Sequence, residues 1–146
     1  MKNLKLLWAL CLATLGLVSC EMEPNQNFQQ EDLYGTWQEV GTEAFVRFMS
    51  PEEDSAYVEI QADSTQVTYL YGCEWDLADD VNESDLVYHG NGWFRWKLVQ
   101  SDLTEIHLMD NGGAEIPKIY TVTTLTQNEL VYQDTYKKAH SFTRVP

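Results

Sequence analysis

The sequence predicts an all-β domain, built as an antiparallel sandwich or barrel. From Gly35 onward, short runs of alternating apolar and polar residues are separated by turn signals every eight to fourteen residues. No stretch of a dozen residues carries the 3.6-residue apolar repeat of an amphipathic helix. Short strands at such spacing are typical of sandwiches and barrels, and a length of 146 residues suits one domain.

The first 19 residues predict a cleaved signal peptide that precedes the domain. Lys2 and Lys5 provide a positive start, and an apolar run follows over residues 6–18. This run is too short to span a membrane as a stable helix, and it lacks the polar face of a surface helix. Residues 1–19 are therefore expected to direct export and to be removed.

The end of this segment, Leu17-Val18-Ser19-Cys20, resembles the lipobox of bacterial lipoproteins. The resemblance implies that Cys20 carries the lipid and becomes the first residue of the mature chain. Residues 20–32 are polar and acidic, as expected of a tether. We therefore expect an outer membrane lipoprotein in the cell envelope of a Gram-negative bacterium, attached to the membrane through Cys20, on either the periplasmic or the cell-surface face.

The strongly acidic charge excludes some partners. Removing residues 1–19 leaves 127 residues (146 − 19) with 7 basic and 23 acidic side chains, a net charge of −16. Binding a nucleic acid backbone requires a positive surface, so no nucleic acid partner is expected. Cys73 is the only other cysteine of the mature chain, which excludes an intramolecular disulfide, and a lone cysteine of this kind is usually a small buried hydrophobe.

Turn signals divide the domain into short strands. Residues 56–62 alternate apolar and polar side chains, and residues 67–75 place Tyr69, Tyr71 and Trp75 on one face. An acidic loop follows from Asp76 to Asp85. The expected strands are residues 37–48 (one strand pair or one long bent strand), 56–62, 67–75, 86–89, 93–100, 104–109, 119–125, 130–133 and 139–144.

Three short motifs resemble the lipocalin-like domain family of small Gram-negative bacterial lipoproteins. They are Leu33-Tyr34-Gly35-Thr36-Trp37, the hairpin motif at residues 124–130 and Phe142-Thr143-Arg144-Val145. The resemblance implies an up-and-down barrel of about eight strands over residues 33–146. It also implies that Gly35, Trp37 and Arg144 close the barrel, with the Arg144 guanidinium over the Trp37 ring, a contact that contributes about 0.5–2 kcal/mol.

No pattern of catalytic or metal-binding residues is present. The nucleophile, phosphate-loop and paired-ligand motifs are missing, and His89, His107 and His140 stand alone in sequence. The loop from Asp76 to Asp85 lacks the EF-hand spacing, which favours a solvated loop over a calcium site. The sequence therefore predicts no enzyme activity, no catalytic residue, no metal site and no cofactor.

Aromatic residues give the main indication of a ligand. Seventeen of the eighteen lie after residue 19. A barrel of eight strands encloses either packed side chains or one small ligand, and Tyr and Trp suit a pocket for an amphipathic molecule. We therefore predict a monomer that binds a small apolar or amphipathic ligand, with Tyr69, Tyr71 and Trp96 as lining residues; the alternative is that the rings only fill or cover the barrel.

Two other functions fit the same composition. An acidic domain can capture a basic envelope partner as an inhibitor or a scaffold, because complementary charge accelerates association. Exposed rings of Trp93, Trp96 and Tyr88 would instead suit contact with carbohydrate. These alternatives differ in whether the charge or the aromatic surface is used.

Overall fold

The computed structural model describes residues 26–109 and 113–146. The predicted signal peptide and Cys20 lie outside these residues. The described part forms nine strands and three short 3-10 turns, so the prediction of an all-β fold is confirmed. The strands are β1 (Gly35–Glu39), β2 (Ala44–Phe48), β3 (Tyr57–Ile60), β4 (Gln66–Asp76), β5 (Trp93–Val99), β6 (Asp102–Leu108), β7 (Glu115–Leu125), β8 (Glu129–Gln133) and β9 (Ala139–Arg144).

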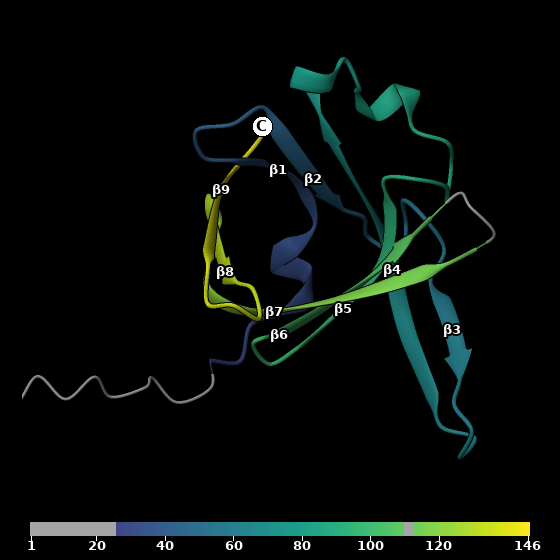
Figure 1. Ribbon diagram of the computed structural model, residues 1–146. Coiled ribbons are helices and arrows are strands. Elements are labelled where there is room, and N and C mark those ends of the chain that lie inside the picture. Colours follow the sequence, from purple (N-terminus) through teal and green to yellow (C-terminus); the bar gives the residue numbers. More distant parts are fainter. Residues whose placement is uncertain (1–25, 110–112) are drawn as a thin grey trace, which may run out of the picture.

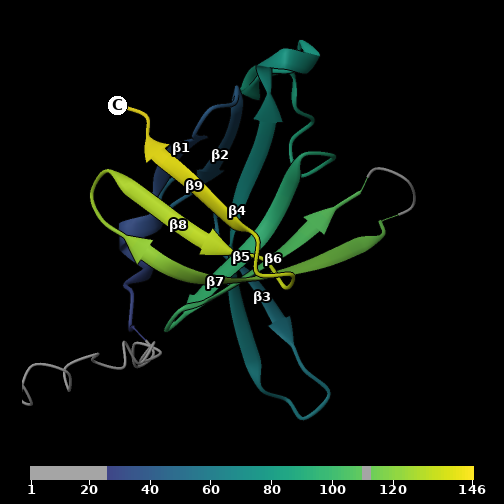
Figure 2. The same ribbon diagram turned by 60° about the vertical axis from the view of Figure 1, so that its left-hand side comes forward.

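Eight of the strands close into an antiparallel barrel, which confirms the predicted architecture. From β4 to β9 each strand pairs with the next one in sequence. The circle is completed where β9 pairs with β1, β1 with β2, and β2 with β4. Closure leaves these strands without a free edge across most of their length. Figure 2 shows β8, β9 and β1 side by side at this seam.

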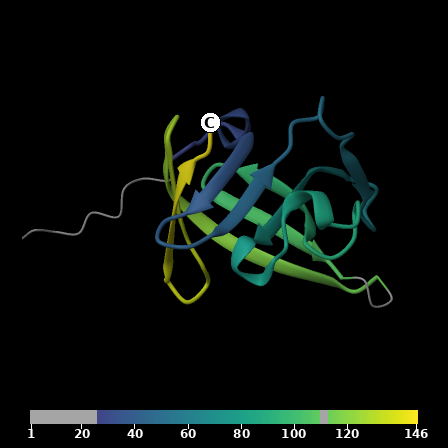
Figure 3. The ribbon, with the colours of Figure 1, turned by 90° about the horizontal axis from the view of Figure 1, so that it is seen from above.

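The ninth strand, β3, lies outside the circle. Both β2 and β3 pair with β4, with Phe48 opposite Gly72 and Tyr57 opposite Tyr69. The two strands therefore pair with successive parts of β4, and the segment 49–56 connects them. In Figures 1 and 3, β3 stands at the right of the molecule, away from β8 and β9 at the left.

At two segments the structure settles or corrects the expected strands. Residues 37–48 form the strand pair, the first of the two expected alternatives, because the chain turns at Gly41, whose φ of +79° favours glycine. Residues 86–89 form no strand. His89 has a φ of +55°, and its ring stacks on Tyr71 with ring centroids 3.8 Å apart.

One end of the barrel is closed by the contact between the first and last strands. Arg144 lies over the Trp37 ring, with Cζ 4.1 Å from the ring centroid. The guanidinium also donates to the carbonyl oxygens of Asp32, Tyr34 and Gln127. The indole N–H of Trp37 donates to the Leu33 carbonyl at 2.8 Å. These bonds fix the 3-10 turn η1 (Gln30–Leu33) across this end.

The core fills the same end. It consists of buried apolar side chains from every strand of the circle. Strands β2, β5 and β8 contribute two or three each, and the other five strands contribute one each. The largest fully buried members are Trp37, Trp96, Phe48, Phe94, Leu33, Leu103 and Leu130. Gly72 is required beside Phe94, because a Cβ there would lie 2.5 Å from the ring. Close packing of this kind leaves no space for a ligand at this end.

The ordered fold begins earlier than the predicted domain boundary at residue 33. The Phe28 ring packs against the core, and the backbone N–H of Phe28 donates to the Gln100 carbonyl at 3.2 Å. The C-terminal half of the expected tether, residues 20–32, is therefore part of the barrel's closed end. Among the described residues, no helix is long and apolar enough to cross a membrane.

Candidate ligand-binding cavity

The opposite end of the barrel contains a cavity of about 700 Å³. Its walls come from inward-facing positions at the ends of the strands and from the segment that follows β4. This volume lies within the range of about 300–1,000 Å³ that is usual for small-molecule sites. The inward-facing residues that line it include Glu39, Ala44, Val46, Glu74, Asp76, His107, Ile116, Lys118, Tyr120, Tyr132, His140 and Phe142.

The deeper wall of the cavity is aromatic. Tyr120 and Tyr132 pack together with ring centroids 4.5 Å apart, and the ring centroids of Tyr132 and Phe142 are 5.0 Å apart. Burial raises the pKa of both tyrosines, and the nearby Glu105 carboxylate raises it further. Their hydroxyls therefore stay protonated and can donate a hydrogen bond to a bound molecule.

A charged network lies beside this aromatic wall. His107 is buried on β6, and its Nε2 lies 2.9 Å from Glu105 Oε2 while its Nδ1 lies 3.3 Å from Glu74 Oε1. The Lys118 ammonium approaches the same Glu74 oxygen at 3.7 Å. The imidazole is thus held between two carboxylates, with a lysine from the neighbouring strand β7 beside them.

This arrangement fixes the charge of His107. Burial by itself lowers the pKa of an imidazole, but the hydrogen bonds to Glu105 and Glu74 outweigh it and raise the pKa of His107 to about 9. The imidazole therefore carries a positive charge at neutral pH. Burial also raises the pKa of Glu105, while the contacts with His107 and Lys118 hold the pKa of Glu74 below its ordinary value.

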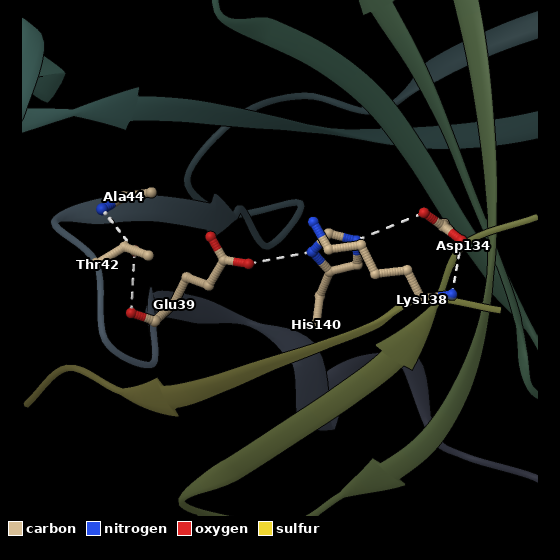
Figure 4. Close-up of polar contacts among 6 residues, drawn as sticks. All are labelled: Glu39, Thr42, Ala44, Asp134, Lys138 and His140. Atoms are coloured by element: carbon tan, nitrogen blue, oxygen red, sulfur yellow. Dashed lines mark hydrogen bonds and ion pairs between the residues drawn. The ribbon is translucent and has the colours of Figure 1, made fainter. Parts of the chain in front are cut away.

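A second set of polar contacts crosses the seam between the first and last strands. His140 on β9 places Nδ1 3.0 Å from Glu39 Oε1 on β1 and Nε2 3.7 Å from Asp134 Oδ2 (Figure 4). The backbone N–H of Lys138 donates to Asp134 at 3.0 Å, which holds the β8–β9 turn. This wall of the cavity therefore presents Glu39, His140 and Lys138 together.

The three predicted lining residues lie elsewhere. Trp96 points inward but is fully buried in the closed end, with its ring centroid 5.1 Å from that of Phe48. Tyr69 and Tyr71 belong to the opposite face of β4 and point outward, where Lys97 lies over the Tyr69 ring and His89 stacks on Tyr71. None of the three lines the cavity. The residues of β4 that do line it are Glu74, Trp75 and Asp76.

The aromatic surface expected for carbohydrate contact is mostly buried. Trp96 is fully buried and Trp93 is 7% exposed, whereas Tyr88 is 65% exposed. The Tyr88 hydroxyl donates to Asp54 Oδ1 at 2.7 Å, and His89 Nε2 lies 2.7 Å from the other Asp54 oxygen. The expectation of exposed tryptophans is therefore wrong, since the outer rings hold residues 88–89 against the segment after β2.

The acidic loop uses several of its polar side chains locally. It forms the 3-10 turns η2 (Leu77–Asp79) and η3 (Glu83–Asp85). Asp76 accepts from the Ala78 N–H, and Asn82 with Asp85 forms a capping box. Within the described residues, no group of three or more His, Cys, Asp or Glu side chains is arranged to hold a metal ion.

Cys73 is fully buried on the outer face of β4, against Met49 and Trp93. Burial raises the pKa of its thiol to about 12. The side chain is therefore protonated and inaccessible, as expected of a buried hydrophobe.

The charged network was not predicted from the sequence. On β6 the residues Glu105 and His107 alternate with Ile106 and Leu108, and this alternation usually places the apolar pair inside. The structure has the opposite parity, with Glu105 and His107 in the barrel. Glu105 and His107 share a strand face with Leu103, and this apolar residue at the same parity is the sequence feature that points to the inward face.

The fold and the cavity define a class: a closed eight-stranded antiparallel barrel, filled at one end and hollow at the other. Comparison with protein-family models, with curated proteins and with solved structures found no match for this chain.

Proposed function

We propose that this protein binds one small amphipathic ligand in the open end of its barrel. The observation that carries the proposal is a cavity of about 700 Å³ whose lining combines aromatic rings with charged side chains. Tyr120, Tyr132 and Phe142 offer an apolar surface, while Glu74, Lys118 and His140 offer polar contacts. A site of this kind binds the body of a ligand by burial and orients its polar group by a few hydrogen bonds.

We further propose that the barrel is an envelope lipoprotein, attached through a lipid on Cys20. The signal-like segment and the lipobox-like ending support this proposal, as does the resemblance to small lipocalin-like lipoproteins. Mass spectrometry of the chain purified from membranes tests it. The expected mass is that of residues 20–146 with acyl chains, and Cys20→Ser should abolish the modification. An unmodified or uncleaved wild-type chain would contradict the proposal.

The ligand proposal is tested with the neutral amphiphile octan-1-ol. The full chain is placed in nanodiscs of zwitterionic lipid, and binding is measured by calorimetry after subtraction of protein-free nanodiscs. Saturable binding of one molecule per chain is expected. Ala44→Trp places a large ring at a cavity-lining position and should weaken binding by at least about tenfold.

The matched control is Ala56→Trp. Ala56 is exposed beside β3 and does not line the cavity, so this variant should bind like the wild type. Octan-1-ol, octylammonium and octanoate all failing to saturate the wild-type chain would overturn the proposal. Equal binding by the two tryptophan variants would also overturn it, because the cavity would then not be the site.

A further inference from the structure

We propose that the cavity selects amphiphiles with a cationic head, such as a protonated alkylamine, and that the Glu105 carboxylate receives this head. This inference rests on the proposed binding function and adds the chemical class of the ligand. It comes from a buried carboxylate oxygen that lacks a partner, together with the balance of charges around the cavity.

Glu105 is only 2% exposed, and its side chain points into the barrel between Leu103 and His107. Oε2 contacts His107 at 2.9 Å, but Oε1 is buried without a hydrogen-bond partner. Leaving such a buried oxygen unpaired is destabilising, and more so when the group is charged. The neighbours of Glu105 on either side, His107 along β6 and Lys118 across the strand pair, both line the cavity. Glu105 itself does not line the cavity, but it lies directly behind the wall that these two neighbours form.

The remaining charges favour a cation over an anion. Four carboxylates line the cavity and Glu105 lies behind them, against three cations: Lys118, Lys138 and the imidazolium of His107. The net charge of these five carboxylates and three cations is therefore −2. Both Lys118 and His107 are already paired with Glu74, so they offer little to an incoming anion. The four lining carboxylates are Glu39, Glu74, Asp76 and Asp79.

The net charge of the whole chain also favours a cationic ligand. The chain carries a formal charge of −14, and the segment after β4, which contributes Asp76 and Asp79 to the lining, is acidic. A field of one sign that converges on a cavity raises the local concentration of oppositely charged ligands and their association rate. An amine donates two or three N–H groups, which match a carboxylate oxygen that only accepts.

The test compares three ligands that differ only in the head group: octylammonium, octan-1-ol and octanoate. The full chain in zwitterionic nanodiscs is titrated by calorimetry at neutral pH, with protein-free nanodiscs as the blank. Octylammonium is expected to bind at least about tenfold more tightly than octan-1-ol, and octanoate more weakly than both. Equal or tighter binding of octanoate would overturn the inference while leaving the proposed function standing.

Substitutions then identify the residue that causes the preference for octylammonium over octan-1-ol. Glu105→Gln keeps the shape of the side chain, removes its charge, and should lower the ratio of octylammonium to octan-1-ol affinity to within about threefold. Glu129→Gln is the matched control, because Glu129 is exposed and does not line the cavity; its ratio should equal that of the wild type.

Glu39→Gln provides a second variant at a partly exposed lining position, for use if Glu105→Gln loses its thermal unfolding transition. It should lower the same ratio by about threefold. An unchanged ratio in a folded Glu105→Gln chain would overturn the assignment of Glu105. An unchanged ratio in Glu39→Gln would contradict the role of the lining charges.

Discussion

The charge state of His107 makes barrel stability depend on pH in a direction that can be worked out. The pKa of His107 is raised from 6.5 to about 9 by the carboxylates of Glu105 and Glu74. The folded protein therefore holds one more proton than the unfolded chain between these two values. Stability from this site is complete below pH 6.5 and is lost as the pH rises to about 9. At about 1.4 kcal/mol per pKa unit, the loss is about 3 kcal/mol.

The assay is denaturant unfolding of the purified full chain, followed by tryptophan fluorescence at several values between pH 6.5 and about 9. The reference is the double variant Glu105→Gln with His107→Gln, which removes the imidazole together with the more buried of its two carboxylate partners. The wild type should lose about 3 kcal/mol of unfolding free energy relative to this variant across the window. Parallel pH profiles for the two chains would refute the reasoning, because His107 would then have the same pKa in both states.

Three further predictions concern the frame of the barrel. Arg144→Lys removes the planar donors that reach the carbonyls of Asp32 and Gln127, so denaturant unfolding should show a loss of about 2–3 kcal/mol; an unchanged midpoint would contradict this. Gly72→Ala forces a Cβ to within 2.5 Å of a ring and should cost about 2 kcal/mol or more, whereas Gly113→Ala, which has open space around it but a φ of +75°, should cost about 1–2 kcal/mol from backbone strain alone. Cys73 should resist alkylation in the native chain and react only in denaturant, as read by peptide mass spectrometry; labelling of the folded protein would show that its burial is incomplete.

The positions of most strands can be predicted from the sequence, because apolar–polar alternation and turn residues are local features. The strand at 139–144 follows from such signals, and β9 has those bounds. Residues 86–89 show where local signals fail. Val87 and Tyr88 have strong strand propensity, yet bonds to Asp54, more than thirty residues earlier, hold this segment as a turn.

The cavity could not be located from the sequence, because a strand pattern does not say which face points inward. On β4 the face with Tyr69 and Tyr71 looks like the interior, since aromatic side chains are usually buried there. That outer face is covered by Lys97 and by residues 88–89 instead, while the inner face carries Leu70, Gly72 and Glu74. A strand covered on both sides gives no alternation from which the interior can be chosen.

The distribution of polar residues inside the barrel argues that its open end is shaped for binding and not for stability. On β6, Leu103 completes the packed end, and the next inward positions are Glu105 and His107. Replacing buried charged pairs by apolar residues of similar size is often neutral or stabilises a protein by about 1–4 kcal/mol. Apolar side chains at these two positions would extend the core that already joins Leu103, Trp96 and Phe48. A carboxylate with an unpaired oxygen stands there instead, next to a cavity large enough for a ligand. The polar residues at these positions therefore support the proposal that a bound molecule completes this contact.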